Sequence, residues 1–373
     1  MKIAYLSTFY PYRGGIAHFN ALLYRAFEQQ SNTIKAFTFT RQYPEILFPG
    51  STQYVSSADK VDNIPAVRVL DTINPITYFS TAHQIQKFKP DILVMKYWMP
   101  FFAPSLGTVA RLLRKKGVKT AAILDNVKPH EKRIGDNLLN RYFLSSLDFA
   151  VVMSPTVEQD LKDLSPSLPY VFHPHPTYNH FGQKLPKSQA REYFNIPNHA
   201  KVLLFFGLIR AYKGLDVLIE SFNRLSEEYY LLIAGEPYED TQKYRALVAQ
   251  NKNRERIFIY EKYIPDNEVN LFFSAADVNI LPYKSATQSG VLTISYHFDL
   301  PVIVTKVGSL HDTVEKYRTG ITIQHADVPH LVEAITSFFH SSYSYEENIS
   351  NFKKVYTWES LAAQIVEHAK TIR

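Results

Sequence analysis

The stretch that decides the fold runs Lys201-Val-Leu-Leu-Phe-Phe-Gly-Leu-Ile-Arg-Ala-Tyr-Lys-Gly-Leu-Asp216. An apolar run typical of a buried strand ends at Gly207, and Gly214 opens an amphipathic segment over residues 215–224. Two cations, Arg210 and Lys213, lie in the turn between them. Cations beside a strand-to-helix turn can neutralise phosphates, and arginine can do so with two parallel hydrogen bonds. The spacing alone fits a phosphate site and an ordinary surface loop about equally.

The same alternation of short apolar runs and amphipathic stretches extends in both directions from this segment. Further strands are expected at residues 2–7, 34–38, 92–96, 120–124, 149–153, 230–234, 256–260, 278–281 and 302–305, with helices between them. Around residues 168–197 the rhythm stops in a segment rich in proline and histidine, which predicts an inter-domain connection. A chain of 373 residues suits two domains. We therefore predict two Rossmann-like α/β domains with parallel sheets, at 1–183 and 184–356, with a cleft between them and a last helix over 357–373.

Composition narrows the class of protein. Hydrophobic residues make up 46% and charged residues 20%, so the chain can bury a large core. The chain has no cysteine, which excludes disulfides, thiolate metal sites and cysteine nucleophiles. No apolar run is long enough to span a membrane, so a soluble, cytoplasmic protein is expected.

The net charge of +6 is unevenly distributed. Residues 1–186 carry a net charge of +8 and residues 187–373 a net charge of −2. A dense basic run lies at residues 111–119. Such a patch attracts anionic surfaces such as lipid headgroups or nucleic acid, or it is simply the solvated end of a helix.

Two further segments suit anion binding. Ser289, Gly290 and Val291 precede an apolar helix, whose first N–H groups can bind an anion or be capped by a serine or threonine. Gly14 and Gly15 follow the first strand, but they lack the G-x-G-x-x-G spacing, so NAD binding is not supported. The pair also fits a plain tight turn.

Polar residues also follow the strand at 120–124 and fill the predicted connection. Asp125 and His130 can each contact a polar ligand or act as a base, or each can serve as a hydrogen-bonded loop residue. His173, His175 and His180 suggest a metal by composition, but the proline between the first two and the linker context argue against a metal site.

Taken together, these segments resemble glycosyltransferase family 4, the retaining enzymes of the GT-B fold, over nearly the whole chain. The resemblance lies in motifs that occur in the family's order: Gly14-Gly15, Gly207-x-x-Arg210-x-Tyr-Lys213-Gly-Leu-Asp, Ala234-Gly-Glu236, Tyr263-Ile-Pro-Asp266, Ala275-Ala-Asp277 with Pro282-Tyr283, the run from Pro301 to Gly308, and Trp358-Glu359. It implies that the last helix crosses back to the first domain.

The resemblance also implies an activity: transfer of a sugar from a UDP- or GDP-sugar, with retention of configuration and without a metal. The second domain would bind the donor and the first the acceptor, a glycan or a lipid-linked molecule at the inner face of a membrane. Arg210 and Lys213 would stabilise the leaving diphosphate. The remaining donor-binding positions would be Gly14, Gly15, Ile16, Gly207, Glu236, Tyr263, Ile264, Thr287, Ser289, Gly290 and Val291, with Tyr263 and Ile264 reading the base.

The chain departs from the family pattern in one loop. Many members carry two glutamates separated by seven residues, and an ungapped count back from Pro301 places Ala286 and Ile294 there. A loop shortened by two residues brings Gln288 to the first position instead, within a Thr-Gln-Ser-Gly variant. Glutamine can hydrogen-bond sugar hydroxyls but carries no charge.

Three functions other than sugar transfer are alternatives for this sequence. A nucleotide-sugar 2-epimerase shares the GT-B fold but needs acid and base carboxylates that the sequence does not place in the cleft. A non-catalytic sugar- or nucleotide-binding protein is motivated by the missing glutamates, although such a protein has no need of both Arg210 and Lys213. No nucleic-acid-binding motif accompanies the basic charge.

Overall fold

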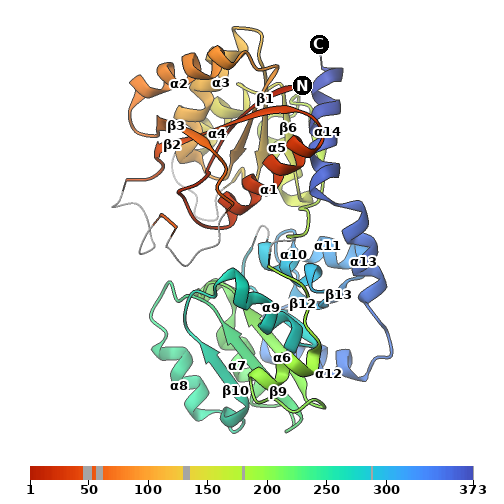
Figure 1. Ribbon diagram of the computed structural model, residues 1–373. Helices are drawn as coiled ribbons and strands as arrows, with labels where there is room; N and C mark the ends of the chain where they lie inside the picture. Colours follow the sequence, from red (N-terminus) through yellow and green to blue (C-terminus); the bar gives the residue numbers. More distant parts are fainter. Residues whose placement is uncertain (45–52, 56–61, 129–134, 179–180, 287–288, 373) are drawn as a thin grey trace. The chain divides into compact units, whose positions relative to one another are not determined.

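The computed structural model divides the chain into two compact units, each with its own parallel sheet (Figure 1). The first unit is Met1–His175 with Tyr356–Arg373, and the second is Pro176–Val355. The structure describes all residues except 45–52, 56–61, 129–134, 179–180, 287–288 and 373. The predicted α/β class with parallel sheets is confirmed.

The first unit is built on a seven-stranded sheet of order β3-β2-β1-β4-β5-β6-β7. Its strands are β1 (Lys2–Leu6), β2 (Thr33–Arg41), β3 (Ala66–Asp71), β4 (Ile92–Tyr97), β5 (Lys119–Leu124), β6 (Phe149–Val152) and β7 (Tyr170–Phe172). Every neighbouring pair is parallel, so all strands end at one edge of the sheet. The central strands are buried on both faces, as parallel sheets require.

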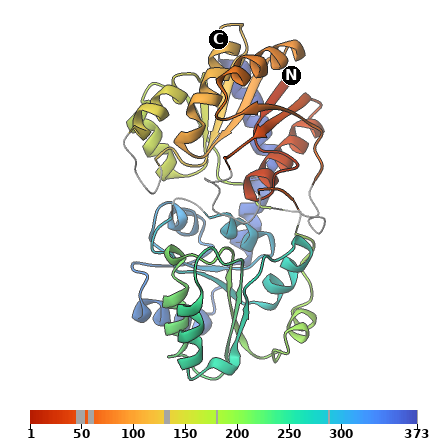
Figure 2. The ribbon, with the colours of Figure 1, turned by 90° about the vertical axis from the view of Figure 1, so that its left-hand side faces the viewer.

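Two helical layers cover this sheet. One face carries α2 (Pro75–Phe88), α3 (Ala103–Arg114), which follows the short turn η2 (Pro100–Phe102), α4 (Asp136–Leu144) and α5 (Pro155–Leu164). These helices share an apolar core with the sheet. The other face carries α1 (Gly15–Gln29) and the last helix α14 (Trp358–Thr371), which pack together through Phe19 and Trp358 (Figure 2). The chain therefore ends in the first unit.

The second unit repeats the pattern on a six-stranded sheet of order β10-β9-β8-β11-β12-β13. Its strands are β8 (Lys201–Phe206), β9 (Tyr229–Ala234), β10 (Ile257–Tyr260), β11 (Val278–Leu281), β12 (Val302–Thr305) and β13 (Gly320–Ile323). Its helices are α6 (Lys187–Tyr193), α7 (Leu215–Phe222), α8 (Gln242–Gln250), α9 (Asp266–Ala275), α10 (Gly290–His297), α11 (Leu310–Tyr317), α12 (Val328–His340) and α13 (Glu346–Val355), with 3-10 turns η3 (Ala211–Lys213) and η4 (Arg254–Arg256). No helix in the described part of the chain is long and apolar enough to cross a membrane.

The predicted connection at residues 168–197 is wrong at both ends. Tyr170–Phe172 is strand β7, which pairs in parallel with β6, and Lys187–Tyr193 is helix α6. Two of the histidines between these elements, His173 and His175, contact residues of the first unit. His173 is 1% exposed and lies 2.8 Å from the Ser360 hydroxyl through Nε2, while the His175 ring packs on Phe19. His180 lies outside the described residues.

His173 makes the first unit sensitive to acid. Burial lowers the pKa of its imidazole from 6.5 to about 4, although its Nδ1 donates to the Pro174 carbonyl. The unfolded chain therefore binds a proton that the folded chain rejects. Between pH 6.5 and 4, this group is expected to remove up to about 3 kcal/mol of the unfolding free energy.

Urea unfolding at several pH values tests this expectation. His173→Asn should lose stability less steeply than the wild type below pH 6.5, while His199→Asn, at an exposed histidine, should follow the wild type. Equal slopes for wild type and His173→Asn would show that His173 is protonated in the folded chain.

Candidate functional site

The carboxyl edge of the second sheet gathers most of the predicted donor-binding residues. Strands β8, β9 and β11 are neighbours, and the residues that follow them meet at this edge. The Gly207 N–H donates to the Ala234 carbonyl at 2.9 Å, and the Ile209 N–H donates to the Glu236 carbonyl at 2.9 Å. The turn after β8 is thus held against the turn after β9, at the edge where parallel α/β sheets bind ligands.

Two glycines allow these turns to approach each other. A Cβ at Gly235 would lie 1.9 Å from the Gly207 carbonyl oxygen. Gly207 itself has φ +103°, and a Cβ there would lie 2.9 Å from Lys213 Nζ and 3.1 Å from Val291 Cγ2. Backbone, ammonium group and the first turn of α10 therefore converge at a position that only glycine can occupy.

Lys213 is a buried cation at the centre of this edge. Its side chain is 6% exposed, and Nζ lies 5.5 Å from the centre of the Tyr283 ring. No carboxylate in the described part of the chain pairs with it. Burial, and then the nearby Arg210 charge, lower the pKa of the Lys213 ammonium to about 8. A buried ammonium group without a counter-ion is a site prepared for an anion.

Arg210 supplies a second positive charge three residues before Lys213. Arg210 directly precedes the 3-10 turn η3, which ends at Lys213, and the half-buried Arg210 guanidinium lies 5.0 Å from the centre of the Tyr238 ring. Gly214, with φ +69°, directly precedes α7. This position requires glycine, because a Cβ there would lie 2.0 Å from the Pro282 carbonyl oxygen. The sequence therefore folds so that both cations face one edge.

The first turn of α10 lies beside Gly207 and Lys213. Ser289 precedes Gly290 at the start of the helix, caps no N–H with its side chain, and lies 3.2 Å from the Tyr283 hydroxyl through Oγ. The first N–H groups of an α-helix have no partner within the helix and attract anions. Thr287 and Gln288 lie outside the described residues.

The predicted base-reading residues follow β10, next to β9. The Tyr263 side chain is 40% exposed and Ile264 is buried, while Glu236 is half-buried after β9. The order β10-β9-β8 places these residues on one side of Lys213 along the edge. A ligand bound at Lys213 can therefore extend toward an exposed aromatic ring and a carboxylate.

In the first unit, the two predicted segments follow β1 and β5. Gly14 has φ +104° directly before α1, which begins at Gly15 and Ile16, so a positive φ and a helix N-terminus coincide here. Asp125 follows β5 and is 21% exposed, and its Oδ1 accepts a hydrogen bond from Lys96 Nζ at 2.6 Å. His130 lies outside the described residues.

Lys96, the partner of Asp125, was not among the predicted site residues. Its side chain is 2% exposed, and Nζ lies 3.3 Å from the centre of the Phe19 ring on α1. Burial lowers the pKa of Lys96 and raises that of Asp125, and the ion pair opposes both shifts. A lysine inside an otherwise apolar parallel strand was the available signal, because such a residue needs a buried partner.

Removing either partner of this ion pair should lower the unfolding free energy, but by unequal amounts. Asp125→Asn strands a lysine that is almost fully buried, whereas Lys96→Met strands a carboxylate that reaches solvent. Asp125→Asn should therefore cost about 3 kcal/mol of unfolding free energy and Lys96→Met clearly less, with the double variant below the sum of the two. Urea unfolding of the three variants measures this, and additive costs would contradict the pairing.

The chain is similar in sequence to known glycosyltransferases. Residues 186–355 match the family model described as Glycosyl transferases group 1. D-inositol 3-phosphate glycosyltransferases from Corynebacterium urealyticum and Corynebacterium diphtheriae are 25% identical over 197 residues and 24% identical over 276 residues. These matches cover 50% and 68% of this chain but only 46% and 62% of the relatives.

Solved structures resemble the whole chain. The Anabaena protein Alr3699/HepE in complex with UDP superposes with a TM-score of 0.76 at 12% identity, covering 100% of both chains. Sucrose-phosphate synthase from Thermosynechococcus elongatus superposes with a TM-score of 0.74 at 18% identity, covering 99% of this chain and 98% of that one. At such identities the likeness establishes the fold alone.

Proposed function

We propose that the protein transfers a hexose from a nucleotide-sugar to an acceptor, because residues 186–355 match the model of Glycosyl transferases group 1 and the chain has the GT-B fold. The donor is a UDP- or GDP-sugar, and the UDP bound by the Anabaena protein supports the former. The acceptor is a glycan or a lipid-linked molecule of cell-surface polysaccharide or glycoconjugate synthesis. Configuration at the anomeric carbon is retained.

The observation that carries this proposal is the buried, unpaired ammonium group of Lys213 against Gly207. Breaking the bond between the sugar and the diphosphate leaves negative charge on the phosphate oxygens. Lys213, Arg210 and the first turn of α10 place positive charge and N–H donors at one sheet edge before the reaction begins. Preorganised charge of this kind lowers the barrier without reorganisation during the step.

The remaining roles follow the two units. We assign donor binding to the second unit, Pro176–Val355, and acceptor binding to the first unit, Met1–His175 with Tyr356–Arg373. Asp125 either contacts the donor sugar or takes the proton of the acceptor hydroxyl, since its second oxygen has no hydrogen-bond partner in the described part of the chain. The phosphate charge is met by Lys213 and Arg210, so no metal is needed.

A panel of UDP-, GDP- and ADP-sugars tests the proposal, with thermal shift reporting binding and nucleotide release reporting turnover. The acceptors include D-inositol 3-phosphate, which the names of the sequence relatives suggest. Transfer should give the retained anomer and persist in a metal chelator. Turnover of UDP-N-acetylhexosamine without an acceptor would indicate an epimerase, binding without turnover would indicate a binding protein, and no binding would refute the proposal.

A further inference from the structure

A pocket of about 300 Å³ lies in the second unit beside β13, the edge strand of the six-stranded sheet. Helix α11 contacts both β13 and α13 around it (Figure 1). Glu315 and Arg318 line the pocket from α11 and its end, Thr322 from β13, and Tyr343 and Tyr345 from the segment between α12 and α13. Strands β11 and β12 separate β13 from β8, so this pocket is distinct from the edge that carries the predicted donor site.

Tyr343 presents a fixed ring to this pocket although its side chain is 49% exposed. Its hydroxyl oxygen accepts a hydrogen bond from Asn348 Nδ2 at 2.7 Å. Its ring meets the Tyr345 ring edge to face, with 4.7 Å between the centroids, and the Tyr345 ring stacks on Phe338 at 5.8 Å. An exposed ring that is held on two sides offers a preformed surface, on which a ligand can stack without ordering the side chain first.

Glu315 offers a carboxylate oxygen to the same pocket. Its Oε1 lies 2.9 Å from Lys306 Nζ and accepts from the Thr322 hydroxyl at 2.8 Å. Hydrogen bonds from Lys306 and Thr322 hold the pKa of Glu315 below its usual value, so the carboxylate stays ionised near neutral pH. Its Oε2 has no hydrogen-bond partner among the described residues, and it can therefore accept from a ligand.

Arg318 adds a donor on the other side of the charge balance. Its backbone ends α11 with φ +51°, in the left-handed region that helix ends usually give to glycine. The Asn348 side chain donates to its carbonyl at 2.8 Å, but the guanidinium has no hydrogen bond or ion pair with the residues that the structure describes. An arginine is thus kept in an unfavourable backbone conformation while its side chain contributes no contact to the fold.

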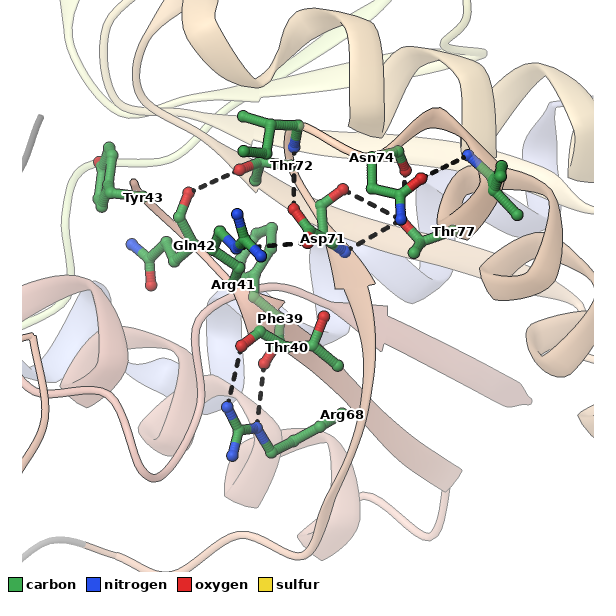
Figure 3. A network of polar contacts seen from close by, with 12 residues as sticks. Phe39, Thr40, Arg41, Gln42, Tyr43, Arg68, Asp71, Thr72, Asn74 and Thr77 are labelled. Carbon is green, nitrogen blue, oxygen red and sulfur yellow. Dashed lines mark hydrogen bonds and ion pairs between the residues drawn. The ribbon is translucent and has the colours of Figure 1, made fainter. Parts of the chain in front are cut away.

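Arginines at the ends of β2 and β3 in the first unit show the contrasting arrangement (Figure 3). Arg41 Nε pairs with Asp71 Oδ2 at 3.3 Å. The Arg68 guanidinium donates to the carbonyls of Phe39 and Thr40 at 3.2 and 3.0 Å. These side chains spend their donors within the chain, as most polar groups of folded proteins do. The open guanidinium of the pocket beside β13 is instead available to a ligand.

We propose that this pocket, which we call the α11–β13 pocket (Glu315, Arg318, Thr322, Tyr343 and Tyr345), binds a neutral sugar ring of a glycan. The C–H face of the sugar stacks on the Tyr343 ring, whose face carries the negative part of its quadrupole. Glu315 Oε2 accepts from sugar hydroxyls, and the Arg318 guanidinium donates to sugar oxygens.

The charge and size of the pocket select this class of ligand. An anion would face the Glu315 carboxylate and a cation would face the Arg318 guanidinium, so a neutral ligand rich in hydroxyl groups fits best. The volume of about 300 Å³ lies at the lower end for small-molecule sites, which suits one sugar ring. The proposal goes beyond the proposed function, because no step of sugar transfer uses these residues. A second hold on a glycan would keep an acceptor near the enzyme between transfers.

Saturation-transfer NMR with methyl glycosides of glucose, galactose, mannose and N-acetylglucosamine, without any nucleotide, tests the pocket. At least one glycoside should receive saturation from the full chain and should keep it when UDP is added in excess. Tyr343→Ala and Arg318→Gly should each raise the Kd for that glycoside at least about 10-fold. Tyr193→Ala is the matched control, at a tyrosine of the same unit that is 59% exposed, and should bind as the wild type does.

The variants also separate binding from folding. Arg318→Gly should melt at or above the wild-type temperature, because φ +51° suits glycine, so loss of the sugar in this variant would not reflect unfolding.

Four results would overturn the proposal: no saturation of any of the four glycosides, wild-type Kd in both variants, displacement of the glycoside by UDP, or displacement by inorganic phosphate, which would indicate an anion site at Arg318. The measurement uses no nucleotide-sugar, so its failure leaves the proposed function standing.

Discussion

Replacing Lys213 by alanine is expected to lower turnover at least ~100-fold, which is the scale of losing one charge contact to a transition state, about 2.7 kcal/mol. Lys213 is 6% exposed and has no counter-ion in the described part of the chain, so nothing else in its position can take over the charge. The loss should fall mainly on kcat, because charge on the leaving diphosphate grows during the step. Nucleotide release with the best donor measures it.

One control variant makes the Lys213→Ala result specific. Lys252→Ala removes an exposed lysine beyond α8 at the opposite edge of the same sheet and should leave turnover unchanged. Lys213→Ala should itself fold, because removing an unpaired buried charge relieves a desolvation cost. Wild-type turnover in Lys213→Ala would remove this residue from the site.

Replacing Gly235 by alanine is expected to abolish nucleotide binding and to destabilise the second unit by about 3 kcal/mol or more. The new methyl group would lie 1.9 Å from the Gly207 carbonyl oxygen, in backbone that cannot move as a side chain does. The ends of β8 and β9 would separate, and the turn that carries Arg210 and Lys213 would shift with them. Thermal unfolding and UDP titration report the two effects.

Gly117→Ala is the matched control for this glycine. Gly117 has φ +81° but no atom within 4 Å of its Cβ position, so its replacement should cost about 1 kcal/mol from backbone strain alone. UDP binding by Gly235→Ala with wild-type affinity would show that the approach of the two turns is not needed for the site.

Much of this architecture was predictable because its signals are local. The apolar run that ends at Gly207 and the cations at Arg210 and Lys213 lie within one turn, so the sequence places them together without knowledge of the fold. Strands β3 and β13 escaped prediction because they are edge strands with mixed burial. Strand β7 has three half-buried residues and adjoins a run of histidines and prolines, which resembles a linker.

Features that depend on contacts between residues far apart in the sequence could not be predicted from the sequence. The partner of Asp125 is Lys96, which is 29 residues away and becomes its neighbour only because β4 and β5 pair in register.

Proton uptake on nucleotide binding tests most directly whether Lys213 binds the diphosphate of a nucleotide. With a pKa of about 8, this lysine is about half protonated at pH 8 in the free protein, and a bound diphosphate should raise its pKa and complete its protonation. Calorimetry of UDP and GDP binding at pH 8, in buffers of different ionisation enthalpy, should show uptake of about half a proton and affinity that falls as pH rises further. Lys213→Arg should bind without uptake. Absence of nucleotide binding, or equal uptake in Lys213→Arg, would contradict the claim.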